Sequence, residues 1–227
     1  MNQSGCSTNS QVVWPKLVDH YTLTGYELSH AQALALTAED TRLKVFCDAA
    51  QQYSMTLSVG LPLRIDNDFF LAAMIFFPDG TNQTYAKRAL HGEEKRYFSP
   101  GKQSGISGQS PRKTAQIICA DLNEARFAEE AATHADLYAA SVLVSANGYQ
   151  HDVELLETWS HRYHIPVLMS NHARPSGGLH SAAQSGFWNS QGQCVIRADR
   201  EECIMIARRS SGKWRGECHT FTESETE

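Results

Sequence analysis

The sequence lacks the cysteine pattern of a zinc protein and the charge pattern of a nucleic-acid-binding protein. Its 227 residues contain six scattered cysteines and no CxxC pair, which argues against a structural zinc site. The formal net charge is −5 and no basic stripe occurs, so neither nucleic acid nor an anionic membrane surface is expected as a partner. The polar N-terminus has no apolar secretory core. A reducing, cytoplasmic location with free thiols is therefore predicted.

Long hydrophobic runs and nucleotide-binding motifs are also missing. The longest apolar run, Phe69–Phe77, has nine residues and is too short to span a bilayer as a helix. Lys102 is followed by Gln103 rather than by Ser or Thr, so there is no P-loop, and no GxGxxG occurs. Ser185 does not lie in a GxSxG elbow, which argues against a serine α/β-hydrolase. These absences predict a protein without a cofactor.

Histidine is the one metal-ligating residue type that clusters. His161 and His164 are three residues apart on an expected helix, and His151 is nearby. Such a set could bind a metal, but histidines on an exposed helix face are usually solvated. No metal site is predicted.

What the chain does contain is an alternation of strand and helix patterns. A Thr37 N-cap and helically spaced apolar residues predict an amphipathic helix over 36–53, and apolar segments at 55–63 and 69–77 predict buried strands. The later expected elements are strands at 115–119, 139–146, 165–170, 193–197 and 203–207, and helices at 123–134 and 151–163. Adjacent strand pairs mixed with β–α units indicate an α/β fold with mixed sheets and outer helices, not a purely parallel one.

One thiol lies where an expected strand meets an expected helix. Cys119 ends the apolar step that begins near Gln116, and Asp121 and an Ala-rich helical stretch follow. Backbone N–H groups at a helix start lower the pKa of a thiol, which would suit a nucleophile. An inert core cysteine would fit the same place. The local pattern leaves both interpretations open.

An ordered set of motifs resembles one family. The segments are "TLTGYEL" at Thr22–Leu28, "YAKRALHGEEKRYFSPG" at Tyr85–Gly101 and "ICAD" at Cys119. They are followed by "ADLYAASVLVSANGY" and by "IPVLMSNHARPSGGLHSAAQSGFWNSQGQ". Together they resemble the nitrilase superfamily, also called the carbon–nitrogen hydrolases, from about Thr22 to Ala207. In that family a strand carries Tyr-x-Lys, a Glu precedes a Phe-x-Pro-Gly turn, and a Cys ends the next strand.

The resemblance implies a fold and three site residues. The fold would be α/β, with two mixed β-sheets packed as a sandwich and helices on the outside. Cys119 would be the nucleophile, and Lys87 the lysine that faces the tetrahedral intermediate. Glu94, six residues before Pro100, would be the second glutamate of the site. An ammonium at Lys87 would stabilise the oxyanion and hold Cys119 as a thiolate, while a carboxylate would move protons between water, thiol and leaving ammonia.

The general-base glutamate of the family has no counterpart here. Aligned on "LTGYE", the position is occupied by His20; aligned on "VVWPKL", it is occupied by Lys16. Neither register supplies a carboxylate, and His20 is the expected substitute because an imidazole titrates in the right range. The family's opening strand and helix also lack a counterpart, so 1–21 is expected to be a divergent or truncated N-terminal segment.

The expected organisation is thus a hydrolase domain at 22–215 and a disordered acidic tail at 216–227. By its resemblance the protein would hydrolyse non-peptide carbon–nitrogen bonds of a small amide or nitrile substrate through a thioester, with activity impaired by the missing base. The alternative is an inactive homologue that acts as a binding or structural subunit. The resemblance also implies a homodimer formed through outer helices.

Overall fold

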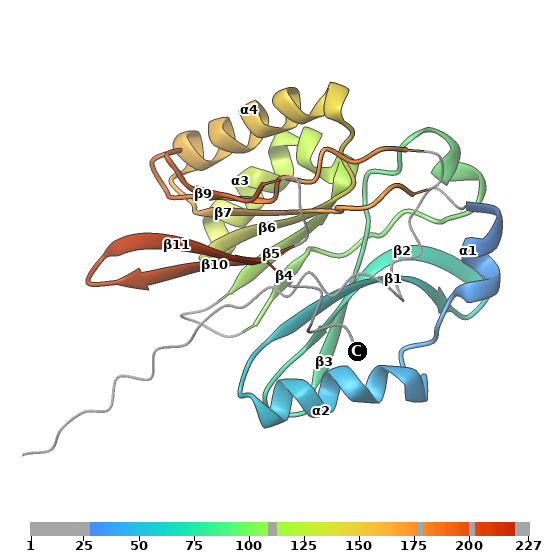
Figure 1. Ribbon diagram of the computed structural model, residues 1–227. Coiled ribbons are helices and arrows are strands. Elements are labelled where there is room, and N and C mark those ends of the chain that lie inside the picture. The colour runs from blue at the N-terminus through green and yellow to red at the C-terminus, as the bar shows by residue number, and fades with distance from the viewer. Residues whose placement is uncertain (1–27, 109–112, 177–178, 200–202, 221–227) are drawn as a thin grey trace, which may run out of the picture.

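The computed structural model describes residues 28–108, 113–176, 179–199 and 203–220. These residues form four layers, which are helix, sheet, sheet and helix (Figure 1). The predicted α/β sandwich with outer helices is therefore confirmed. No helix in the described ranges is long and apolar enough to cross a membrane.

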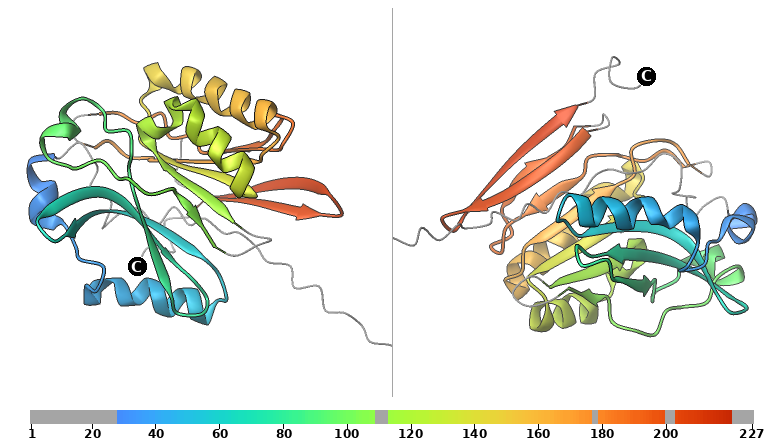
Figure 2. Two further views of the ribbon diagram at one scale, coloured as in Figure 1. Left: turned by 180° about the vertical axis from the view of Figure 1, so that it is seen from behind. Right: turned by 90° about the horizontal axis from the view of Figure 1, so that it is seen from below.

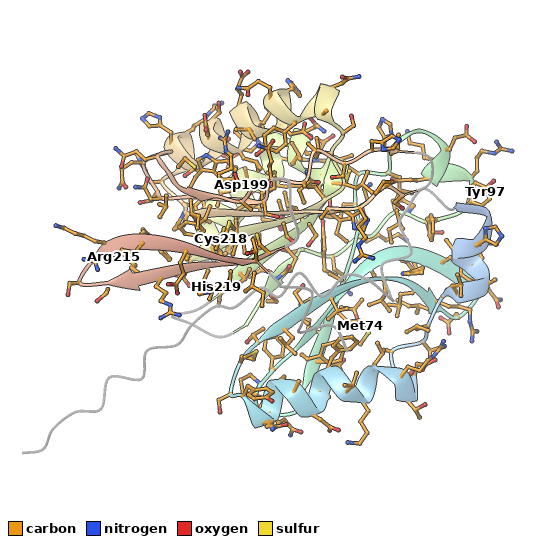
Figure 3. The ribbon with its side chains drawn as sticks, viewed as in Figure 1. Met74, Tyr97, Asp199, Arg215, Cys218 and His219 are labelled. Atoms are coloured by element: carbon orange, nitrogen blue, oxygen red, sulfur yellow. The ribbon has the colours of Figure 1, made fainter. Side chains whose placement is uncertain are left out.

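The smaller sheet and its helix form the first two layers. The sheet has the order β1-β2-β3 and is antiparallel, with strands Leu57–Ile65, Asp68–Phe76 and Asn82–Ala86. Its outer face is covered by α2, Lys44–Gln52, which follows the short 3₁₀ helix η1, Thr41–Leu43 (Figure 1). Phe46 and Ala50 of α2 pack into one apolar cluster with Met74, which lies on β2 (Figure 3).

The larger sheet forms the third layer and is mixed. Its order is β4-β5-β6-β7-β8-β9, with strands Ile106–Ser107, Thr114–Ile118, Leu137–Val142, Val167–Asn171, Gly186–Trp188 and Cys194–Arg197. Strands β5, β6 and β7 are parallel to one another, and the other pairs are antiparallel. Helices α3, Ala125–His134, and α4, Ala146–Tyr163, form the outer layer (Figure 2). Ser58 of β1 bonds Gln116 of β5 across the two sheets at 3.1 Å.

The last two strands form a hairpin that extends beyond the larger sheet. Strands β10, Cys203–Ser210, and β11, Lys213–Thr220, pair with each other, and Arg215, Cys218 and His219 lie along β11 (Figure 3). The hairpin is held by Trp214, whose ring centroid lies 4.5 Å from that of Phe187.

The hairpin corrects one prediction. Residues 216–220, expected in a disordered tail, are part of β11, because pairing with β10 satisfies their backbone groups despite their polar side chains. Residues 221–227 lie outside the described residues.

Other element boundaries also differ from the predicted ones. Helix α1, Leu28–Leu34, and the short strands β4 and β8 were not predicted. Helix α4 begins at Ala146, five residues before the predicted start, and β6 ends at Val142 rather than at 146. The strand ends early because the backbone of Val144 is not bonded to the backbone of a neighbouring strand. Its N–H and its carbonyl are bonded by the side chain of Asn171 instead.

A glycine in β11 gives a test of how the hairpin docks. A Cβ at Gly216 would lie 2.3 Å from the Cβ of Ile196 on β9, so Gly216→Ala must push the hairpin off the sheet. We expect the free energy of unfolding to fall by about 1–3 kcal/mol in urea titrations. Gly60→Ala is the matched control, since a Cβ there meets nothing within 4 Å. Equal stability of the two variants would contradict the docking.

Candidate active site

Cys119 lies at a strained turn directly after β5. Ile118 has an extended backbone, whereas Cys119 has φ 47° and begins the 3₁₀ helix η3, Cys119–Asn123. A left-handed backbone at a non-glycine residue costs about 1–3 kcal/mol and is kept only where surrounding contacts impose it. The predicted position of Cys119, between a strand and a helical turn, is confirmed.

Lys87 and Glu94 form a buried ion pair beside this turn. Lys87 follows β3, and Glu94 lies in the 3₁₀ helix η2, Gly92–Arg96. The Lys87 Nζ lies 2.8 Å from Oε1 and 2.7 Å from Oε2 of Glu94, and the two residues are only 1% and 3% exposed. The N–H of His91 donates a further bond to Glu94 Oε2 at 2.7 Å. Both carboxylate oxygens thus accept from donors that fix the position of the carboxylate.

The charges of this pair reach the Cys119 thiol. Burial raises the pKa of Cys119, the Lys87 ammonium lowers it, and the Glu94 carboxylate raises it again. The net pKa is above the usual range of a thiol. Lys87 and Glu94 are thus paired with each other, and the charges of both act on the Cys119 thiol.

The direction of the Cys119 pKa is opposite to the one expected for a thiolate. Lys87 is present as predicted, but a carboxylate less than 3 Å from its Nζ offsets much of its field at the sulfur. The residue is half-buried, and this burial of the thiol outweighs what remains of the attraction, because a low-dielectric environment disfavours the charged form. The thiol is the resting form at neutral pH.

Two further groups act on the thiol and were not found from the sequence. The backbone N–H of Leu143 donates to the sulfur and lowers the Cys119 pKa, while the charge of Asp152 raises it. Both groups come after the end of β6 in the chain. Strand β6 runs parallel to β5, with Ile118 opposite Ser141. The pKa of Asp152 itself is raised by burial. A backbone donor leaves no signal in a sequence. Asp152 was predicted to lie at the start of a helix, but that helix begins several residues earlier.

Asp121 is the most buried charged group of the site. It is 0% exposed, and its Oδ2 accepts from Tyr85 Oη at 2.7 Å and from the N–H of Ile118 at 2.9 Å. Its Oδ1 accepts from the N–H of Ala89 at 2.7 Å and of Arg88 at 3.2 Å. An acidic residue three positions after a helix N-cap commonly bonds back to the cap N–H, and this spacing was the signal available in the sequence.

The position of the general base is outside the described residues. His20, predicted as the substitute base, and Lys16, its alternative, both lie in 1–27. Among the residues described, no group of three or more His, Cys, Asp or Glu side chains is arranged to hold a metal ion. His161 lies on α4 and His164 is the residue that caps its C-terminal end, and their ring centroids are 6.4 Å apart.

Comparison with known proteins identifies the relatives of this chain. The family model described as carbon-nitrogen hydrolase matches residues 12–216. Among solved structures, XC1258 from Xanthomonas campestris, a CN-hydrolase superfamily protein, is 16% identical with a TM-score of 0.72, and the match covers 94% of this chain and 77% of that one. At this identity the likeness shows the fold.

Two further structures share the fold. The NitN amidase from Nesterenkonia sp. AN1 is 20% identical with a TM-score of 0.68, covering 81% of this chain and 71% of that one. Nit3 from Saccharomyces cerevisiae, a member of the nitrilase superfamily, is 20% identical with a TM-score of 0.67, covering 72% and 62%. The match thus spans less than two thirds of Nit3.

The pH dependence of alkylation tests the electrostatics of the thiol. Iodoacetamide reacts with the thiolate, so a raised Cys119 pKa means slow labelling at pH 7, slower than at the exposed Cys194. We expect the Cys119 rate to rise about tenfold per pH unit, as the thiolate fraction does below the pKa. The rise should continue past pH 9.0, the usual thiol value. Peptide mass spectrometry measures each site, and a Cys119 plateau below about pH 8 would contradict the raised pKa.

Proposed function

Since the chain belongs to the carbon–nitrogen hydrolase family, we propose that it is a cysteine-dependent amide hydrolase with Cys119 as nucleophile and Lys87 as the oxyanion-stabilising cation. The observation that carries this proposal is the buried Lys87–Glu94 pair, whose charges act on a thiol held at a left-handed turn. A lysine that is 1% exposed has no solvation to stabilise it. Its retention in the core is explained by a role at the thiol.

The proposed chemistry has two halves. In the first, the Cys119 sulfur attacks the amide carbon, and the carbonyl oxygen becomes an oxyanion near the Lys87 ammonium. The thiol proton passes to the amide nitrogen, the C–N bond breaks, and ammonia leaves a thioester on the sulfur. In the second, water adds to the thioester carbon and gives up a proton, the C–S bond breaks, and the acid and the free thiol are released.

We assign Glu94 the role of holding Lys87, not of moving protons. Both of its oxygens already accept from Lys87, and Oε2 also accepts from the N–H of His91. A carboxylate in this position holds the ammonium in place, because a buried charge is stable only beside a partner whose geometry is fixed. The sequence-based expectation gave Glu94 the proton transfers. The geometry supports the holding role better.

The proton transfers then need another group, and we propose His20. The resting thiol must lose a proton in the first half, and water must lose one in the second. The family match begins at residue 12, so it includes both His20 and Lys16. An imidazole accepts protons near neutral pH, whereas a second ammonium near Lys87 would be repelled by it. Without a carboxylate at this position, turnover is slow.

The substrate class we propose is a small aliphatic amide. One structure of the Nesterenkonia amidase holds butyramide in a variant whose cysteine is replaced by alanine. That amidase and this chain share a fold, and butyramide is therefore the first substrate to test. The homodimer and the cytoplasmic location stay predictions from the sequence.

The second candidate is a catalytically inactive binding subunit. It is favoured by the raised pKa of Cys119, which leaves the nucleophile protonated at neutral pH. The two candidates differ in whether any carbon–nitrogen bond is broken.

Ammonia release from butyramide separates the two candidates. We expect the wild type to turn over below about 0.1 per second, some hundredfold under a median enzyme, because the base is weak. His20→Glu should raise the rate at least about tenfold by restoring a carboxylate. Cys119→Ala should abolish what remains.

Lys16→Glu is the matched control, since it places the same carboxylate in the other register. A gain only in Lys16→Glu would move the base position to residue 16. Ordinary enzyme rates in the wild type would refute the impairment, and inactivity of the wild type and both glutamate variants would favour the binding subunit.

Covalent trapping tests the nucleophile without any need for turnover. In the Nesterenkonia amidase, a variant with glutamate replaced by leucine carries the acetamide moiety of fluoroacetamide on its active-site cysteine. A variant with glutamine there carries acrylamide. We expect fluoroacetamide to label Cys119, because attack by sulfur displaces fluoride and the proposed site binds the amide group. The exposed Cys194 should stay unlabelled. Labelling of Cys194 alone would refute the assignment.

A further inference from the structure

Asp121 connects the two segments that carry the nucleophile and its cation. One of its donors, the N–H of Ile118, belongs to the strand end immediately before Cys119. The other three, Tyr85 Oη and the N–H groups of Arg88 and Ala89, lie on both sides of Lys87. A single carboxylate therefore bonds the chain neighbours of both Cys119 and Lys87.

The chemistry of these contacts requires a carboxylate. All four partners are donors, and each oxygen of Asp121 accepts two of them. An ionised carboxylate is acceptor-only, whereas an asparagine would turn an NH₂ group toward either the amides of Arg88 and Ala89 or the amide of Ile118. A buried donor that faces another donor is left unsatisfied.

The bond to Ile118 also supports the left-handed turn. Cys119 has φ 47°, a conformation that a non-glycine residue keeps only under constraint. Asp121 closes this turn by returning to the N–H of the residue before Cys119, and its own buried side chain is held by four donors. The direction of the thiol is thereby tied to the segment of Lys87.

We propose that Asp121 is a positioning residue, which fixes the Cys119 turn and the Lys87 segment in one register and so keeps the thiol within the field of the Lys87–Glu94 pair. The proposal rests on the proposed function for the roles of Cys119 and Lys87. Asp121 itself does not contact the substrate in this scheme. Its effect is on the coupling between the pair and the thiol.

A four-protein cycle measures that coupling. The proteins are the wild type, Asp121→Asn, the pair variant Lys87→Met with Glu94→Gln, and the triple variant. The pair variant removes both charges together, so that neither is left buried alone. Lys87 is the larger of the two influences on Cys119, so its loss raises the thiol pKa and slows iodoacetamide labelling.

We expect the pair variant to slow Cys119 labelling at pH 8 by about threefold in the wild-type background, which corresponds to about half a pKa unit. In the Asp121→Asn background the slowing should fall below about 1.5-fold, because the thiol no longer keeps its place beside the pair. Equal slowing in both backgrounds would overturn the proposal. A merely structural Asp121 would shift the urea midpoint and leave the threefold slowing unchanged.

Two further variants keep the test decisive. Asp136→Asn is the matched control, since Asp136 is an exposed aspartate that accepts the N–H of Lys113 before the other end of β5, and it should leave the coupling at the wild-type value. Tyr85→Phe removes one donor and keeps the carboxylate, so it should reduce the coupling partly if Asp121→Asn does not fold. If the pair variant slowed Cys119 labelling as much in the Tyr85→Phe background as in the wild type, the result would then count against the proposal. Because labelling needs no turnover, an inactive wild type would refute the proposed function without deciding this one.

Discussion

The ion pair between Lys87 and Glu94 is the constraint on which the rest of the site depends. Two opposite charges buried this deeply are stable only when their geometry is held, because each loses its hydration. The chain meets this condition by bringing the turn after η2 back against the end of β3. The N–H of Gly101 donates to the carbonyl of Lys87 at 2.8 Å, and a Cβ at Gly101 would lie 2.1 Å from the carbonyl oxygen of Ala86. Only glycine permits this approach.

Burial and the same pair together set the protonation state of the Cys119 thiol. An unpaired ammonium near Cys119 would favour the thiolate. An ammonium that is paired with a carboxylate lowers the thiol pKa much less. The arrangement is better suited to an oxyanion that forms during the reaction, since Lys87 is already fixed and needs no reorganisation. The site therefore supports a charge that develops in the transition state more than one that exists at rest.

The sequence predicted the elements with strong apolar patterns and the residues that carry motif chemistry. Strands β1, β2 and β5 and helix α3 lie within a few residues of their predicted bounds, because the strands are largely apolar segments and the helix repeats its apolar residues at helical spacing. The hairpin strand β11 was missed because its residues are polar and its order comes from pairing with β10. Cys119, Lys87 and Glu94 were predicted from the family resemblance, through the order and spacing of its motifs, and their roles stay proposals. The direction of the Cys119 pKa could not be predicted, since it depends on the burial of the thiol and on the pairing of Lys87 with Glu94, which a sequence does not contain.

A protonated nucleophile makes the base more important than the thiol in deciding turnover. If Cys119 rested as a thiolate, the first half of the reaction would need no base, and losing one would slow only the hydrolysis of the thioester. Because the Cys119 pKa is raised, the proposed mechanism requires a proton to leave the sulfur before or during attack, and both Glu94 oxygens already accept from Lys87. In the proposed mechanism, both halves then depend on the base, for which we propose His20. Under this proposal a chain can keep the buried pair, the strained turn and the Asp121 bonds and still turn over slowly.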